Sequence, residues 1–159
     1  MAKPERVLRL SGRYQRSQDK SEEEFHDFLS HRHGVECAKI HEKYGILKYQ
    51  MAFNTTKTRG LAESMQLPYP VNSHDMEIEY YFKDVQSLLD VSGDEGFKAL
   101  HAECEPYVDL ATTSVTLTWV EVYLEEGRLV NVDAAGKSMQ PSFAELNDIE
   151  EAGPVAKYY

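Results

Sequence analysis

An amphipathic helix predicted near the start of the chain constrains its fold more than any other feature, because its apolar stripe runs into a histidine. Ser21 and Glu24 have the spacing of a capping box, which satisfies two backbone N–H groups at the start of a helix. Phe25, Leu29 and His33 then recur every four residues, so they share one helical face. His33 is therefore predicted to point into the core.

A second histidine, His31, is predicted to face away from His33. The two residues are about 200° apart on a regular helix at about 100° per residue, so they cannot share one ligand or one proton. A buried neutral imidazole needs only one partner for its N–H, so periodicity alone leaves a hydrogen-bonded core histidine and a catalytic histidine both open. Gly34, the next residue, permits a close backbone approach or a local break in the helix.

The composition is that of one soluble globular domain. The 159 residues can bury a sizeable core without metals or disulfides. No apolar run approaches the roughly 18 residues of a transmembrane helix, and the N-terminus lacks the apolar region of a secretory signal. Cys37 and Cys104 have no metal-binding or redox spacing, which is typical of free thiols in a reducing compartment. We therefore expect a cytoplasmic protein.

Charge and histidine spacing exclude several classes of partner. The net charge of −10 argues against nucleic acid, because phosphate binding relies on clustered Lys and Arg. The six histidines form no HExxH motif, and each helical pair with a residue four positions away offers at most two metal ligands. We expect no metal and no membrane partner. Four histidines are expected on the surface or in loops: His26, His31, His41 and His74.

The remaining pattern predicts four strands and two helical regions. The strands are expected at residues 6–14, 46–53, 75–82 and 112–123, and the helical regions at 22–44 and 84–105, the second interrupted at Gly93. Residues 54–73 form a long connection with a helical turn at 61–67. A connection of this length is typical of a functional or disordered loop.

This order of elements is that of a ferredoxin-like βαββαβ unit, an α+β fold with a four-stranded antiparallel sheet. Its helices can cover only one face of the sheet. The other face is expected to pack against a second copy, which gives a homodimeric α+β barrel. The domain is predicted over residues 5–131. The polar, irregular tail of residues 132–159 is predicted to be a lid, a dimer-swapping arm or a disordered segment.

In its motifs the chain resembles the EthD-type dimeric α+β barrel family. Residues 25–34, FHDFLSHRHG, are similar to the first-helix signature Phe-x-x-Tyr-Trp-x-x-x-His-x-Pro, although Phe28 lacks the hydroxyl of the family tyrosine. Residues 75–84, DMEIEYYFKD, resemble the third strand and the start of the second helix. Residues 94–97, DEGF, resemble the Asp-Pro-Glu-Phe segment. The closing WVEVY at 119–123 is similar to a subgroup of fungal polyketide decarboxylases and dehydratases.

The resemblance implies a lyase of fungal secondary metabolism that acts without a cofactor on an aromatic polyketide. We predict that it decarboxylates a carboxylated anthrone or anthraquinone precursor, with His33 as general acid and base. One imidazole in an apolar cleft would serve a dehydratase or cyclase equally well, and a cofactor-free oxygenase and a non-enzymatic dimer that binds aromatics are further alternatives. Four residues are predicted to bind the substrate: Tyr49, Tyr81, His101 and Trp119.

Overall fold

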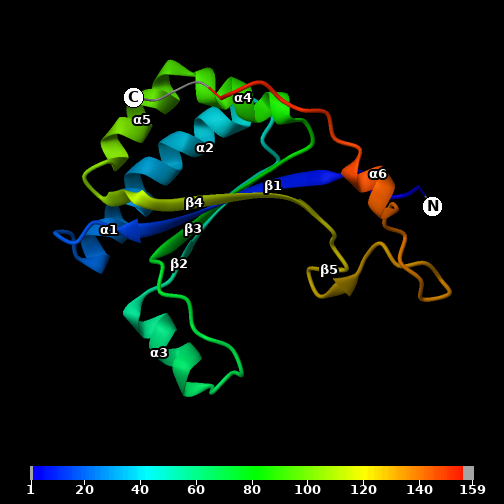
Figure 1. The fold of residues 1–159 in the computed structure, drawn as a ribbon, viewed down its shortest axis with the longest axis horizontal. Coiled ribbons are helices and arrows are strands. Elements are labelled where there is room, and N and C mark those ends of the chain that lie inside the picture. The colour runs from blue at the N-terminus through cyan, green and yellow to red at the C-terminus, as the bar shows by residue number, and fades with distance from the viewer. Residues whose placement is uncertain (1, 156–159) are drawn as a thin grey trace.

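The computed structural model of the protein describes residues 2–155, and its centre is a four-stranded antiparallel sheet (Figure 1). The sheet consists of strands β1 (Val7–Arg16), β2 (Lys48–Phe53), β3 (Met76–Phe82) and β4 (Val108–Val120). The strands lie in the order β2-β3-β1-β4, and each neighbouring pair is antiparallel. The predicted ferredoxin-like α+β fold is confirmed.

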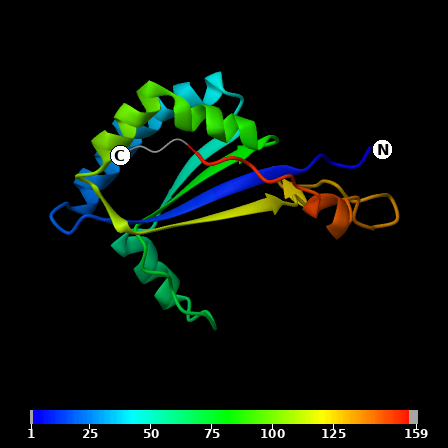
Figure 2. The same ribbon diagram turned by 45° about the horizontal axis from the view of Figure 1, so that its top comes forward.

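The long helices lie together on one face of this sheet (Figure 2). They are α1 (Glu22–Phe28), a π-helical turn η1 (Leu29–His33), α2 (Gly34–Lys43), α4 (Val85–Gly93) and α5 (Glu95–Cys104). Ser21 and Glu24 form the predicted capping box, and the side chains of Asp84 and Asp94 cap α4 and α5. No helix between residues 2 and 155 has the length and apolar character needed to cross a membrane.

The helical run from α1 to α2 contains a π turn that the sequence pattern did not predict. The N–H of Gly34 donates a hydrogen bond to the carbonyl oxygen of Leu29, five residues earlier in the chain. A Cβ atom at position 34 would lie 2.9 Å from this oxygen, so only glycine fits the turn without displacement. The run ends at Tyr44, and Gly45 follows with a φ of +78°, a backbone conformation that favours glycine after the end of a helix.

The core lies between the helix layer and the sheet. Its centre is β3, on which every second side chain is buried against the helices: Met76, Ile78, Tyr80 and Phe82. Phe25 and Leu29 from the first helical run belong to the same buried cluster. A second cluster joins α2 to α4 and α5 and consists of Cys37, Val91, Phe97 and Leu100.

A helix that follows β2, α3 (Thr56–Ser64), projects from the sheet on the side away from the other helices (Figures 1 and 2). It begins before the turn predicted at 61–67, because the Thr55 side chain caps its first turn. Ion pairs from Arg59 to Glu22 and Asp75 hold its base to the body of the protein. The long connection is therefore partly helical, with no buried side chain on α3.

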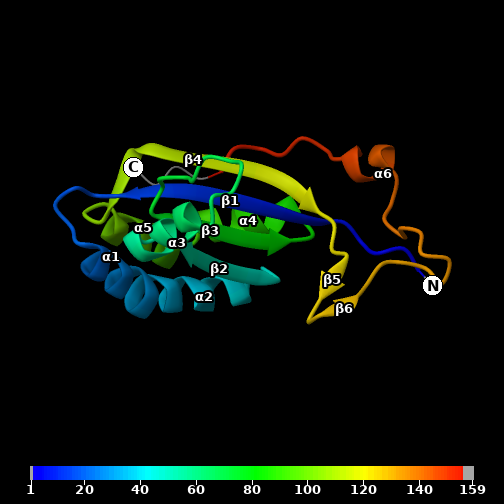
Figure 3. The ribbon, with the colours of Figure 1, turned by 90° about the horizontal axis from the view of Figure 1, so that it is seen from below.

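The tail after β4 contains regular structure that the sequence did not predict. Strands β5 (Leu124–Glu125) and β6 (Arg128–Leu129) form a short hairpin beyond the end of β4 (Figure 3). They are followed by α6 (Phe143–Asn147), which lies beside the N-terminal arm (Figure 1). Leu146 is buried there, and the Arg6 guanidinium donates hydrogen bonds to the carbonyl oxygens of Leu146 and Asp148. These contacts tie α6 to the start of β1.

Candidate active site

The side chain of His33, at the end of the π turn, points toward the sheet. It is 5% exposed, while His31 is exposed to solvent. Phe25 and Leu29 are buried on the same side, so the predicted apolar face survives the π turn. The predictions that His33 faces the core and that His31 does not are confirmed.

Two cysteine thiols contact the imidazole ring of His33. Cys104 Sγ, from α5, lies 3.1 Å from Nδ1, and Cys37 Sγ, one turn further along α2, lies 3.3 Å from Nε2. A neutral imidazole carries one N–H donor and one acceptor nitrogen, so the two thiols can satisfy both. Both cysteines are free, as predicted, and both are buried. The pair around His33 was not predicted, because the two cysteines are far apart in the sequence.

Burial keeps this cluster uncharged. It is the main cause that lowers the pKa of His33 to about 4, and the nearby His101 contributes in the same direction. Burial also raises the pKa of Cys37 to about 12 and raises the pKa of Cys104 well above its usual range. At neutral pH, His33 is therefore a neutral imidazole beside two protonated thiols. In this state it can accept a proton.

His33 lines a small cavity between the helix layer and the sheet. The cavity has a volume of about 30 Å³, which is room for roughly one water molecule. Its polar walls are Tyr14, His33, Tyr80, His101 and Cys104, and the rest of the lining is apolar. No lysine or arginine occurs among the described residues that line it.

Beyond the cavity, the same face of the sheet continues onto an open apolar surface at the β4 edge. Gly12 and Leu10 of β1 pair with Val115 and Leu117 of β4. Val115 and Leu117 are 64% and 52% exposed, since the described helices do not extend over this edge (Figure 3). We call Leu10, Val115 and Leu117 the β4 shelf. The ring of Tyr14 lies over Gly12, 2.6 Å from where a Cβ would be, and so stands between the cavity and the shelf.

Of the five site residues predicted from the sequence, the structure brings two together at the cavity, His33 and His101. Tyr49 lies on the same face of the sheet but outside the cavity lining. Its ring packs against His41 and Tyr80, with centroid distances of 4.6 and 5.3 Å. Burial raises the pKa of Tyr49 well above its usual range, and a hydrogen bond with the Cys37 thiol contributes in the same direction.

The other two predicted site residues lie away from His33. Tyr81 is on the opposite face of β3, where its hydroxyl donates a hydrogen bond of 3.0 Å to Glu79. Because strand side chains alternate between faces, Tyr80 occupies the cavity wall instead. Trp119 lies near the other end of β4, where its ring packs edge-on against Phe143 of α6 at 5.8 Å. Neither Tyr81 nor Trp119 lines the cavity at His33.

His41 is buried, although it was expected on the surface. It is 2% exposed, and neither of its ring nitrogens has a hydrogen-bond partner among residues 2–155. Burial lowers its pKa to about 4. Three aromatic rings surround it at centroid distances of 4.6 to 5.7 Å: Tyr49, Tyr80 and Phe97. Following the four-residue spacing of His33 through Cys37 to His41 would have predicted its burial.

A family model for the EthD domain matches residues 17–111, which is more than half of the chain and includes every residue that lines the cavity except Tyr14. The chain belongs to the EthD family. In this EthD protein, Phe28 stands where the family signature has a tyrosine. Its ring stacks on Tyr107 with a centroid distance of 4.0 Å and lies 6.0 Å from the ring of His33.

Curated fungal relatives of this EthD protein are named as enzymes of different reaction types. A putative oxygenase of Aspergillus terreus is 32% identical over 146 residues, covering 89% of this chain and 91% of the relative. A conidial pigment biosynthesis dehydratase of Metarhizium robertsii is 23% identical, covering 80% and 92%. A decarboxylase of Aspergillus novofumigatus is 25% identical, covering 70% and 76%.

The fold is also that of a solved bacterial protein. The crystal structure of SnoaB, a cofactor-independent oxygenase from Streptomyces nogalater, superposes with a TM-score of 0.51 at 11% sequence identity. The match covers 76% of this chain and 98% of SnoaB. At this level of identity the likeness shows a shared ferredoxin-like fold.

Proposed function

We propose that this EthD protein is a cofactor-free enzyme that modifies an aromatic polyketide, with His33 as its general base. The observation that carries the proposal is the neutral, buried imidazole of His33 on the wall of a mainly apolar cavity. A positioned general base contributes about 10²–10⁴-fold to the rate of a proton transfer, and the lowered pKa of His33 places its contribution toward the lower end of this range. Relatives named dehydratase, decarboxylase and putative oxygenase support an enzyme of this class.

Dehydration of a neutral β-hydroxy ketone is the reaction that this geometry supports best. Neutral His33 would remove the acidic proton next to the carbonyl, and the resulting enolate would expel hydroxide. The imidazolium formed in this step is a far stronger acid than water and would return its proton to the departing hydroxide, releasing water. The same residue thus serves in both half-reactions.

Decarboxylation, predicted from the sequence, is the second candidate. It is supported by the decarboxylase of Aspergillus novofumigatus among the relatives. A carboxylate substrate would have to lie beside His33 without a cationic partner, because the described cavity lining contains no lysine or arginine. Transfer of an unpaired carboxylate from water into an apolar site is costly. A neutral substrate is therefore favoured.

An aromatic polyketide is larger than the cavity, so it must also occupy the β4 shelf. We infer that its reacting carbon lies at His33 while its rings rest on Leu10, Val115 and Leu117, with Tyr14 displaced from between the two. Exposed apolar side chains on a sheet edge bind flat aromatic rings by burial of apolar surface. Binding of the rings would cover Val115 and Leu117, which are 64% and 52% exposed in the free chain.

The partner on the opposite face of the sheet is proposed to be a second copy of the chain. That face is left uncovered by the helices (Figures 1 and 2), and its side chains form ion pairs between Arg9 and Glu79 and between Arg13 and Glu77. Helix α3 and the segment that follows it, residues 65–69, present apolar side chains to solvent beside this face: Leu61, Met65, Leu67 and Tyr69. Sheet packing in a dimer would cover these surfaces.

Turnover is tested by mass-resolved incubation of the purified protein with two substrates, a β-hydroxy ketone and a carboxylated anthrone precursor. Loss of one water that requires His33 supports the dehydratase, and loss of CO₂ supports the decarboxylase. His33→Gln is expected to abolish turnover, and His31→Gln, which changes the exposed neighbour, is expected to retain it. Equal activity in His33→Gln and the unaltered protein would contradict the role of His33.

The dimer is tested by sedimentation equilibrium. The unaltered chain is expected to have twice the monomer mass. Thr116→Arg, on the opposite face of β4, is expected to weaken the dimer, while Glu42→Arg on the exposed side of α2 leaves it unchanged. A monomer at micromolar concentration would contradict the proposed assembly.

A further inference from the structure

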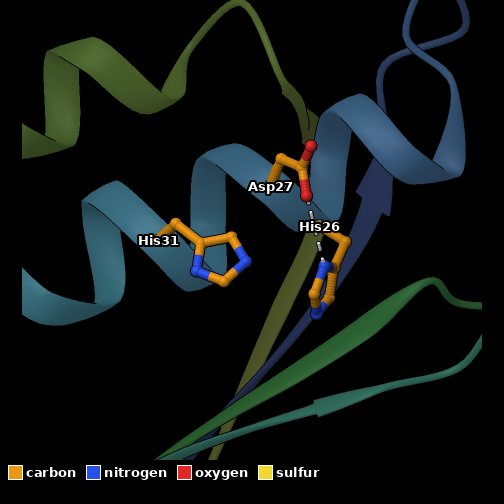
Figure 4. A group of neighbouring side chains, drawn as sticks. All are labelled: His26, Asp27 and His31. Carbon is orange, nitrogen blue, oxygen red and sulfur yellow. Dashed lines mark ion pairs between the residues drawn. The ribbon is translucent and has the colours of Figure 1, made fainter.

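We propose that His26, Asp27 and His31 form a binding site for a divalent transition-metal ion of the zinc class, separate from the cavity at His33. The three side chains lie near one another on the first helical run (Figure 4). One ligand atom from each residue lies within 4.8 Å of the others. It is the one group of three such atoms found among residues 2–155.

The distances suit a tetrahedral ion. Neighbouring ligand atoms around Zn²⁺ are about 3.4 Å apart when each lies about 2.1 Å from the metal. His26 Nδ1 and Asp27 Oδ1 are 3.7 Å apart, close to this spacing (Figure 4). The ring of His31 faces them, with its centroid 5.8 Å from that of His26. Small rotations of exposed side chains would therefore bring all three atoms onto one ion.

The π turn accounts for the approach of the two histidines. His26 and His31 are five residues apart, which places them about 140° apart on a regular α-helix. The widened turn that begins at Leu29 lies between them, and their rings are neighbours. The site is therefore a consequence of the same turn that carries His33.

One ligand is already oriented. The ring of His26 packs against Phe53 of β2 at a centroid distance of 4.7 Å, which limits the directions that its nitrogens can take. Two imidazole nitrogens and one carboxylate oxygen suit Zn²⁺, Cu²⁺, Co²⁺ and Ni²⁺, and the remaining positions would hold water. The net charge of −10 also favours a cation. The buried thiols at His33 do not compete, since they form no such three-atom group.

Metal binding would act on the helix. An ion held by residues on both sides of Leu29 would favour the π turn over a regular helix, because it binds only when the two histidines are neighbours. It would also stabilise the folded state by mass action. The proposed site is thus a clamp on the turn that aims His33 at the cavity.

Zinc binding is measured with a tag-free protein stripped by chelator, by titration of Zn²⁺ against a chromophoric competitor. One Zn²⁺ per chain is expected. His31→Gln and Asp27→Asn are each expected to weaken binding by about tenfold or more. Gly34→Ala, which touches no ligand, is expected to weaken it as well, because a Cβ at that position would lie 2.9 Å from the carbonyl oxygen of Leu29 and open the turn.

Two control variants separate this site from other histidines and thiols. His74→Gln alters a histidine outside the group, and Cys104→Ser alters the cavity; both are expected to bind Zn²⁺ as the unaltered protein does. Circular dichroism establishes that each variant is folded. Absence of binding at millimolar Zn²⁺, or affinity that depends on Cys104 and not on His31, would overturn the proposal. Zinc binding is measured without substrate, so its failure is distinguishable from a failure of the proposed turnover.

Discussion

The backbone N–H of Gly34 donates a hydrogen bond to the carbonyl oxygen of Leu29, and this bond closes the π turn that carries His33. A helix with an extra residue in one turn rotates everything that follows it relative to what precedes it. Cys37 and His41 follow His33 at four-residue spacing along α2, so all three share the buried side that the π turn directs toward the sheet. The chemistry of the cavity depends on a local backbone irregularity.

Substitution Gly34→Ala is expected to destabilise the protein by about 1–3 kcal/mol, as a backbone clash does. The added Cβ would lie 2.9 Å from the Leu29 carbonyl oxygen, which cannot move without breaking the turn. Urea unfolding measures the effect. Gly60→Ala in α3 is the matched control, since a Cβ there meets nothing within 4 Å. Gly60→Ala is expected to stabilise the protein by up to about 1 kcal/mol. The two substitutions should therefore change the free energy of unfolding in opposite directions, and a change in the same direction would contradict the prediction.

Substitution His41→Phe is expected to stabilise the protein at pH 7 by about 1–2 kcal/mol. His41 buries two ring nitrogens without a protein hydrogen-bond partner among the described residues, and such groups are costly. His41→Gln keeps a polar group at the same position and is expected to give no gain. Loss of stability in His41→Phe would mean that the imidazole has a stabilising partner.

Stability is expected to fall as the pH is lowered from about 6.5 toward 4. Burial lowers the folded-state pKa of His33 and of His41 to about 4, against an unfolded value of about 6.5. Between these values the unfolded chain binds protons that the folded chain does not, which favours unfolding. The loss is on the order of 3 kcal/mol per histidine at pH 4.

The pH dependence is measured as the urea midpoint between pH 4 and pH 8. His41→Phe removes one of the two titrating groups, so its midpoint is expected to fall less steeply with decreasing pH. An equal slope in the variant would show that His41 is not a neutral buried group in the folded state.

The two thiols are expected to resist alkylation in the folded protein at pH 8. Burial raises the pKa of Cys37 to about 12, which lowers its thiolate fraction roughly a thousandfold relative to a free thiol. Cys104 is 8% exposed, and its pKa is raised by the same cause. Mass spectrometry after iodoacetamide treatment would show no adduct until denaturant is added. Rapid labelling of either thiol in native buffer would contradict the buried arrangement.

The role of Tyr14 between cavity and shelf is tested by changing its neighbour. Gly12→Ala places a Cβ 2.6 Å from the Tyr14 ring, which must then move. Once a substrate is known, this variant is expected to raise KM about tenfold or more. The added methyl group would narrow the space between the cavity and the shelf that the substrate must occupy. Tyr14→Phe, which keeps the ring and removes the hydroxyl, is expected to leave KM near its original value. Equal KM in Gly12→Ala would argue against substrate on the shelf.

Local patterns predicted much of the architecture. The capping box at Ser21 and the strand expected at 75–82 each depend on neighbouring residues, and each appears as predicted. The inward direction of His33 followed from its four-residue spacing with Phe25 and Leu29. Such signals survive because a helix or strand repeats on the scale of a few residues.

Contacts between distant segments could not be predicted from the periodicity of the sequence. Trp119 was expected near His33 because of its chemistry, but it packs against Phe143 of α6 instead. The tail was expected to be irregular, yet Leu146 is buried beside Arg6. Neither contact has a local sequence signal.

The sequence by itself determined the four-stranded ferredoxin-like unit and the inward-facing histidine, since both follow from short-range periodicity and capping. Only the tertiary structure decided which groups surround that histidine. Cys104 lies 71 positions after His33 in the sequence. The two residues are in contact only because α5 packs against the π turn. The low pKa of His33 has the same origin, because burial by distant segments removes the water that would stabilise its charge.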